Sequence, residues 1–314
     1  MLYRKTRICC RACLLALAVS NPWTLTFPVC AAEEGPGAAA AESLPEESSI
    51  SPNPGRVWLP VPETHLYPLH LADPRRPVFG LQRMHFSHSE IDQAGNDRFG
   101  LKLGGRLGLV RRHPEDRIDR GWQLSIEGGF TGQFDIDNST DNIGWDGVYG
   151  LTLSWRPSQA LAYKLGALHN TSSHRGDEYI ERTGLTRINY TREEMIGGVN
   201  WSITDRWQTY VESAWAYDLR NDELQEPWRA QAGLEYVAAN SIWRQRLGWY
   251  AAVDTNATEE RDWDVDTTVQ AGIMYQARER VWRLGIEYYN GRSLIGEFFQ
   301  DDERYIALGF WLDI

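Results

Sequence analysis

Segments in which apolar and polar residues alternate follow one another from about Gln82 to the end of this 314-residue sequence. Residues 99–109 read FGLKLGGRLGL, and residues 122–134 read WQLSIEGGFTGQF. A period of two places successive side chains on opposite faces of a β-strand. About twelve such segments of roughly ten residues or more can be counted, and no stretch has a convincing helical period. The chain is therefore predicted to be all-β.

The two faces of these strands differ in a way that a soluble sandwich does not explain. One parity is almost purely aliphatic, aromatic or glycine, whereas the other contains charged residues throughout, among them Lys102, Arg106, Glu127, Lys164, Glu212, Glu235, Arg283 and Glu287. An apolar outer face and a charged interior are typical of a transmembrane β-barrel. The predicted fold is thus an up-and-down antiparallel barrel of about twelve strands.

The connections between the predicted strands alternate in length. Long connections are expected at 135–144, 171–187, 219–227, 255–263 and 291–304, and short ones at 157–160, 204–206, 239–241 and 278–280. Outer-membrane barrels have short periplasmic turns and longer external loops. With an even number of strands, this pattern places both ends of the barrel in the periplasm. The predicted location is the outer membrane of a Gram-negative envelope.

Tryptophans mark one end of the predicted barrel. They stand at strand ends beside the short turns, at Trp122, Trp155, Trp201, Trp207, Trp243 and Trp282. Such an aromatic girdle is expected at a membrane interface. The last residues, Tyr305–Ile314, resemble the closing strand that the outer-membrane assembly machinery recognises, although Ile314 replaces the usual terminal aromatic residue.

The N-terminus has the features of an export signal. A basic region that includes Arg4 and Arg11 precedes the apolar run Ala12–Val19, and small residues suitable for cleavage follow at Cys30, Ala31 and Ala32. Acylation of Cys30 is the rival interpretation. All four cysteines lie in this predicted signal, so no disulfide framework is expected in the mature protein. The predicted signal contains no acidic residue, so the mature chain keeps all 43 Asp and Glu residues and is strongly negative. This negative charge argues against a nucleic-acid partner, which requires a basic surface.

Four regions follow from this pattern: a signal peptide at 1–32, a disordered linker at 33–56, a Pro-rich segment at 57–80 and the barrel at 81–314. Five prolines interrupt the Pro-rich segment, so regular structure is not expected there. Its large apolar residues, Trp58, Leu66, Tyr67 and Leu71, predict that it packs on or into the barrel as a plug.

Charged side chains inside the barrel predict ion pairs across the lumen, because isolated buried charges are costly. The candidates are Arg106, Glu127, Glu235, Arg244 and Arg246. The external loops are acidic, notably at Asp135, Asp137 and Asp141. No cofactor is predicted, but these oxygen ligands leave a Ca²⁺ site open, and such ions also bridge lipopolysaccharide phosphates. Outer-membrane lipids and lipopolysaccharide are the expected partners.

A polar cluster, LHNTSSHRGDE, ends the strand that begins at Leu161. If the strand pleat continues, Asn170, Ser172 and His174 point into the lumen, and His169, Thr171 and Ser173 point outward. A hydroxyl, an imidazole and a carboxylate together can form an activated nucleophile. The candidate catalytic residues are Ser172, Ser173, His174, Asp177 and Glu178. The alternative is ordinary turn chemistry at a strand exit.

Three runs carry a resemblance to a known family. These are LADPRRPVF, TSSHRGDEYIERTGLTRINYTREEM and YYNGRSLIGEFF. They resemble the bacterial domain of unknown function 1207 (DUF1207), and the resemblance covers residues 58–314. It implies a signal-bearing outer-membrane barrel of unassigned activity. Its most specific motifs add the candidate binding residues Arg187, Asn189, Arg292 and Ser293.

The pair His169-x-Thr171 also resembles the His-x-Ser motif of outer-membrane phospholipases and lipid A deacylases, with threonine in place of serine. Two functions are therefore kept open. The first is a barrel with a structural, narrow-pore or surface-interaction role. The alternative is a barrel-embedded hydrolase of phospholipid or lipid A with a Ser/His/acid site at the outer rim.

Overall fold

The computed structural model describes residues 55–220, 223–243, 247–277 and 280–313. The predicted signal peptide at 1–32 and nearly all of the predicted linker lie outside these residues. The following sections concern the unit formed by residues 55–313.

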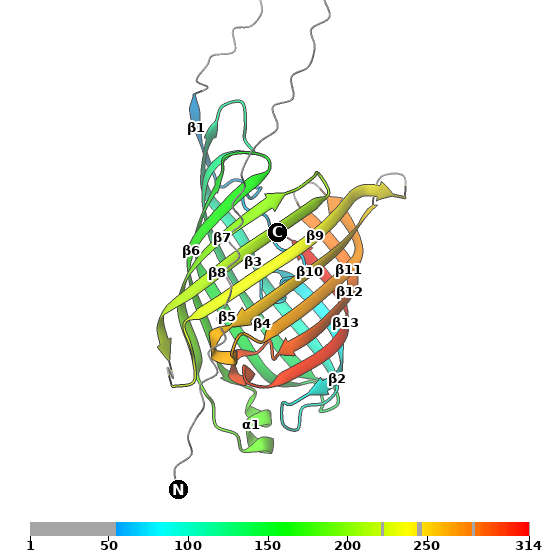
Figure 1. The fold of residues 1–314 in the computed structure, drawn as a ribbon. Coiled ribbons are helices and arrows are strands. Elements are labelled where there is room, and N and C mark those ends of the chain that lie inside the picture. Colours follow the sequence, from blue (N-terminus) through cyan, green and yellow to red (C-terminus); the bar gives the residue numbers. More distant parts are fainter. Residues whose placement is uncertain (1–54, 221–222, 244–246, 278–279, 314) are drawn as a thin grey trace, which may run out of the picture. The chain divides into compact units, whose positions relative to one another are not determined.

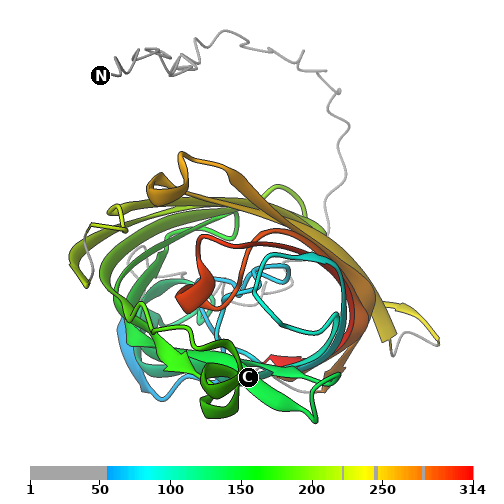
Figure 2. The same cartoon turned by 90° about the horizontal axis from the view of Figure 1, so that it is seen from below.

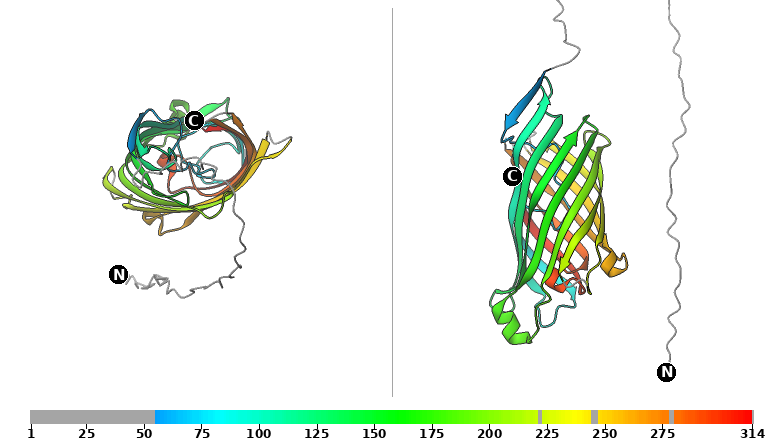
Figure 3. Two further views of the ribbon diagram at one scale, coloured as in Figure 1. Left: turned by 90° about the horizontal axis from the view of Figure 1, so that it is seen from above. Right: turned by 90° about the vertical axis from the view of Figure 1, so that its left-hand side faces the viewer.

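Twelve antiparallel strands form a closed barrel (Figures 1 and 3). Each strand pairs with the next along the chain, and the ring closes where β13 pairs with β2, with Phe310 opposite Leu81. The strands are β2 (Phe79–Ser89), β3 (Asp97–Pro114), β4 (Gly121–Asp135), β5 (Asp141–Arg156), β6 (Leu161–Arg175), β7 (Tyr190–Ser202), β8 (Trp207–Arg220), β9 (Trp228–Ile242), β10 (Leu247–Thr258), β11 (Val265–Ala277), β12 (Arg280–Arg292) and β13 (Asp302–Asp313). The predicted fold class is confirmed.

The barrel wall is apolar outside and polar inside. Leu165, Val211 and Leu308 on the outer face are each at least 60% exposed. Charged residues of the opposite parity, including Lys102, Glu127, Lys164, Glu212, Arg283 and Glu287, are all nearly buried. Among the described residues, no helix is long and apolar enough to cross a membrane.

Connections at the two ends differ as predicted, but several strands are longer than the sequence pattern indicates. The external connection predicted at 135–144 is reduced to residues 136–140, because Asp141 pairs with Asp135 and Asn142 with Phe134. At the outer end of a strand both faces carry polar side chains, so the alternation of apolar and polar residues disappears from the sequence. The backbone pairing between the strands nevertheless continues there. A short helix, α1 (Asp177–Thr183), and two 3₁₀ turns, η1 (Glu259–Arg261) and η2 (Gly296–Phe298), lie in the external loops.

A thirteenth strand, β1 (Arg56–Pro60), pairs with the end of β3 beyond the ring. The expectation that this stretch has no regular structure is wrong for these residues. Pro60 is tolerated because an edge strand can end at a residue without an N–H group. Trp58 is 63% exposed and lies against Arg112, so it does not pack into the barrel.

Residues 61–78, the inner segment, run inside the barrel (Figure 2). Leu66, Tyr67 and Ala72 in this segment are almost completely buried. Backbone oxygens of the segment accept hydrogen bonds from the wall: Lys102 Nζ donates to Pro74 at 2.7 Å, and Arg106 donates to Tyr67 at 3.1 Å. Gly198 on β7 makes room for this packing, because a Cβ atom there would lie 2.8 Å from the Tyr67 hydroxyl.

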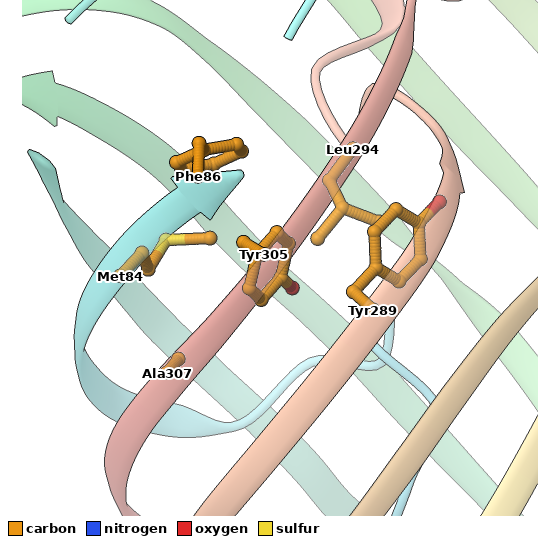
Figure 4. Close-up of a cluster of buried hydrophobic side chains, with 6 residues drawn as sticks. All are labelled: Met84, Phe86, Tyr289, Leu294, Tyr305 and Ala307. Atoms are coloured by element: carbon orange, nitrogen blue, oxygen red, sulfur yellow. The ribbon is translucent and has the colours of Figure 1, made fainter. Parts of the chain in front are cut away.

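The connection between β12 and β13, residues 293–301, is here called the outer loop. It folds into the external end of the barrel, where η2 is visible inside the ring (Figure 2). Leu294 of this loop joins an apolar cluster with Phe86, Tyr289 and Tyr305, which lie on three strands at the closure of the barrel (Figure 4). The lumen is therefore occupied from both ends.

Candidate functional site

A charged chamber lies between the inner segment and the outer loop. Its cavity volume is about 140 Å³, which is enough for several water molecules or a small solute. Residues 68–77 line it on one side, and residues 292–299 line it on the other. Strands β3 to β9 contribute the wall, including Arg106, Lys164, Arg192, Glu212 and Arg229.

Ion pairs organise the wall of the chamber. Arg106 Nε lies 2.8 Å from Glu127, and Arg192 and Arg229 lie 3.0 and 2.8 Å from Glu194. Paired charges of this kind avoid the cost of burying an isolated ion. The predicted lumen pairing is thus present for Arg106 and Glu127. Arg244 and Arg246, named as further candidates, lie outside the described residues.

Glu212 on β8 joins the inner segment to the wall. Its carboxylate accepts a hydrogen bond from the Tyr67 hydroxyl at 2.8 Å, and His70 Nε2 lies 2.7 Å away. Lys164 Nζ, on β6, donates to the same carboxylate at 2.8 Å. The His70 ring also stacks on Tyr210 with a centroid distance of 3.4 Å. One buried carboxylate thus holds two residues of the segment and one of the barrel.

Glu297 of η2 closes the external side. Its carboxylate lies 3.1 Å from Arg175 Nε and accepts hydrogen bonds from the backbone N–H groups of Ile188 and Asn189, at 2.8 and 2.5 Å. The N–H of Glu297 donates to Ser172 Oγ at 2.9 Å. These contacts connect the outer loop to both ends of the connection between β6 and β7.

Four buried polar atoms of residues that line the chamber have no hydrogen-bond partner in the described structure: Arg76 Nη1, Arg292 Nε, His70 Nδ1 and Asp146 Oδ1. Arg76 is otherwise held by Asp313, and Arg292 by Glu260 and Asp266. An unsatisfied buried donor such as Arg76 Nη1 is costly, so this part of the chamber is suited to a ligand group that accepts hydrogen bonds.

A β-bulge corrects the predicted orientation of His174. Trp145 pairs with His174 and Gly147 with Thr171, so Ser172 and Ser173 together oppose the single residue Asp146. The extra residue reverses the alternation. Asn170 and Ser172 face the lumen as expected, but the His174 ring stacks on Trp145 with a centroid distance of 3.9 Å.

Ser172 and His174, which were predicted as nucleophile and base, therefore lie on opposite faces of the wall. Ser172 Oγ is engaged by the Glu297 N–H instead. The side chain of Ser173 lies outside the described structure. Asp177 and Glu178 are exposed in the first turn of α1. Among the side chains of this set that the structure describes, Ser172 contacts Glu297 and His174 contacts Trp145, so these two do not engage each other.

The four predicted binding residues gather near the outer loop. The Asn189 N–H binds Glu297, and Arg187 precedes it on the same connection. Arg292 lies 2.8 Å from Glu260 and 3.2 Å from Asp266. Ser293 is buried, and its backbone oxygen accepts a hydrogen bond from Arg75 at 3.4 Å. Arg292 and Ser293 line the chamber.

Sequence reasoning missed two other groups. Arg75 and Arg76 line the chamber from the Pro-rich segment, and the run DPRRP was the available signal. Glu193 lies opposite His169 on the outer face, where its carboxylate is 2.5 Å from His169 Nδ1. Glu193 stands on the apolar parity of β7, which could have identified it as unusual.

Two of the acidic residues considered for Ca²⁺, Asp135 and Asp137, accept hydrogen bonds within the protein. Asp135 accepts hydrogen bonds from Gly95 N–H at 2.9 Å and from Asn138 Nδ2 at 2.6 Å, and Asp137 accepts from Asp97 N–H at 3.1 Å. Within the described ranges, no group of three or more His, Cys, Asp or Glu residues is arranged to hold a metal ion.

Asp301, at the end of the outer loop, has a raised pKa. Burial and the carboxylates of Glu90 and Glu303 raise the pKa of Asp301 to about 6, although Arg175 and Arg261 oppose the shift. A carboxyl group with a raised folded-state pKa stabilises the fold below its unfolded pKa, and this contribution is lost as the pH rises through about 6.

We therefore expect the outer-loop amides to be better protected from hydrogen exchange at about pH 5 than at about pH 7.5, after correction for intrinsic rates. Asp301→Asn mimics the protonated acid and is expected to remain protected at both values. An unchanged pH dependence in this variant would assign the effect to another group.

Comparison with known proteins agrees with the fold. The family model described as "Protein of unknown function (DUF1207)" matches residues 27–313. No curated protein matches the chain. Solved structures of outer-membrane barrels are also similar, and at the low identity of the two described next the similarity shows the fold alone.

The first is outer membrane phospholipase A from Escherichia coli, with 12% identity and a TM-score of 0.51 over 75% of this chain and 92% of that chain. The second is the calcium-bound dimer of the Salmonella typhi outer membrane phospholipase, with 12% identity and a TM-score of 0.51 over 79% of this chain and 95% of that chain.

Proposed function

This chain belongs to the DUF1207 family of proteins of unknown function, and we propose that it is a narrow outer-membrane barrel that binds a small anionic solute in the charged chamber of its lumen. The position of this chamber between the inner segment and the outer loop carries the proposal. An open pore would leave the lumen free of chain, whereas here Tyr67, His70 and Leu71 bind the wall.

The charge of the chamber favours an anion. Seven of its lining residues are Arg or Lys and five are Asp or Glu: Arg75, Arg76, Arg106, Lys164, Arg192, Arg229 and Arg292 against Asp73, Glu127, Asp146, Glu194 and Glu212. Arginine donors suit carboxylate and phosphate groups, with which they form short charge-assisted hydrogen bonds. The unpartnered Arg76 Nη1 supports the same ligand chemistry.

Conductance across planar bilayers tests this function. The wild-type barrel is expected to pass no steady current, because the inner segment blocks the lumen. Deletion of residues 62–76 is expected to open a narrow path with a preference for anions, seen as a shift of the reversal potential in a salt gradient. Arg229→Gln in the deletion variant is expected to reduce that preference.

A gel shift between heated and unheated samples reports whether the deletion variant folds. If it does not, Tyr67→Phe combined with His70→Ala weakens the hold of the segment in a full-length chain. A wild-type barrel with a large steady conductance, or a folded deletion variant that prefers cations, would contradict the proposal.

The cellular route forms part of the same proposal. Residues 1–32 act as a cleaved signal peptide for export into a Gram-negative envelope, and the assembly machinery recognises the closing strand β13. The apolar outer wall supports a location among outer-membrane lipids, with lipopolysaccharide around the external loops.

A further inference from the structure

A second pocket lies at the opposite end of the barrel, beside the turns at 115–120 and 157–160. Its volume is about 210 Å³, and it is lined by Arg56, Arg112, Arg120, Arg156, Trp122 and Trp155, among others. These short turns mark the periplasmic end of the barrel. The pocket is near β1, which projects with the ends of β3 and β4 in Figure 3.

Within the described structure, no carboxylate forms a close ion pair with any of the four arginines of this pocket. Arg156 donates to backbone oxygens, including that of Gln159 at 2.9 Å, and Arg112 lies 5.6 Å from the centre of the Trp58 ring. Arg120 Nε is buried and has no hydrogen-bond partner.

Asp119, in the adjacent turn, pairs directly with Arg117 at 3.1 and 3.2 Å, and this hydrogen bonding lowers the pKa of Asp119. Its carboxylate also interacts electrostatically with Arg120 and Arg156, but it is one negative charge against four arginines. Glu115 and Asp116 are exposed to solvent. The pocket therefore has an excess of guanidinium donors, which bind phosphate in a planar, bidentate geometry.

Two stacked indoles place this pocket at a membrane interface. Trp122 and Trp155 have a centroid distance of 5.2 Å and an interplanar angle of 12°, and each is about 40% exposed. Tryptophan at a barrel end lies at the level of the lipid headgroups. The exposed residues Ile126, Leu151 and Leu153 continue from the indoles along the outer wall, where acyl chains would lie.

We propose that this pocket binds the phosphate of an anionic glycerophospholipid from the periplasmic leaflet. Arg112 and Arg120 contact the phosphate, Trp122 and Trp155 contact the glycerol region, and the acyl chains follow the apolar face of β4 and β5. The position at the periplasmic end selects phospholipid over lipopolysaccharide, which occupies the outer leaflet.

Native mass spectrometry of the full-length barrel in detergent tests the site with phosphatidylglycerol as the probe. Wild-type protein is expected to retain one phosphatidylglycerol more tightly than phosphatidylethanolamine. Arg112→Gln with Arg120→Gln is expected to weaken this binding about tenfold or more, through loss of charge-assisted hydrogen bonds. Arg206→Gln with Arg280→Gln is the matched control, because it removes equal charge from other turns at the same end.

Arg112→Gln alone, at an exposed position, gives a second variant that retains Arg120. Equal retention of both lipids by the wild type, or an equal loss in the control variant, would overturn the proposal. Competition by inorganic phosphate as effective as by phosphatidylglycerol would show a free-anion site and would also overturn it. Weaker binding of phosphatidylglycerol in the variants that lack Arg112, with unchanged binding in the control variant, supports a lipid site.

Discussion

Glu212→Ala is expected to lower the free energy of unfolding by about 3–5 kcal/mol, the typical cost of removing one partner from a buried ion pair. The change leaves Lys164, a side chain that is 6% exposed, without its carboxylate. It also removes the acceptor for Tyr67 and the contact with His70. Urea unfolding of the barrel in lipid vesicles measures the loss, and proteolysis within residues 61–78 reports release of the inner segment.

A double substitution separates the effect of leaving a buried charge unpaired from the effect of losing packing contacts. Glu212→Leu with Lys164→Met removes both charges, and replacing a whole buried pair with apolar residues is often close to neutral. The double variant is therefore expected to be more stable than Glu212→Ala. A loss below about 1 kcal/mol in Glu212→Ala, the range of an exposed pair, would show that the pair is solvated.

Glu297→Ala is expected to open the external end while the barrel remains folded. The substitution leaves Arg175 buried without its partner and frees the N–H groups of Ile188 and Asn189. Hydrogen exchange at residues 184–189 and in the outer loop is expected to accelerate on the order of a hundredfold or more. Amides in the middle of the strands are expected to keep their protection.

Glu181→Ala provides the control for this experiment, since Glu181 is an exposed carboxylate on α1, in the same connection. It is expected to change exchange little. If the two variants accelerated exchange equally, the effect would reflect the loss of negative charge at this end and not the specific contacts of Glu297.

The barrel could be predicted from the sequence because lipid and lumen impose different chemistry on the two faces of each strand. That difference repeats along the wall, as in residues 161–168, where exposed Leu165 lies between inward Lys164 and Gly166. Strand ends were less predictable. Asp141 and Asn142 lie beyond the lipid-facing part of β5, so alternation no longer marks them.

The candidate site was harder to predict, for two physical reasons. A single extra residue at Ser172–Ser173 reverses the face of His174, and a bulge leaves no periodic signal. The chamber depends on contacts between residues far apart in the chain, such as Arg76 with Asp313. No local pattern connects a Pro-rich stretch with the last strand.

The contact between Arg76 and Asp313 has a consequence for how the barrel forms. Arg76 lies just before the first barrel strand, and Asp313 is the last residue of β13, where it also binds Arg283 at 2.8 Å. The contact joins the residues just before β2 to the end of β13, so it can form only when the two ends of the barrel wall come together. Closure of the ring and this attachment of the inner segment are therefore coupled long-range contacts, and such contacts make folding slow.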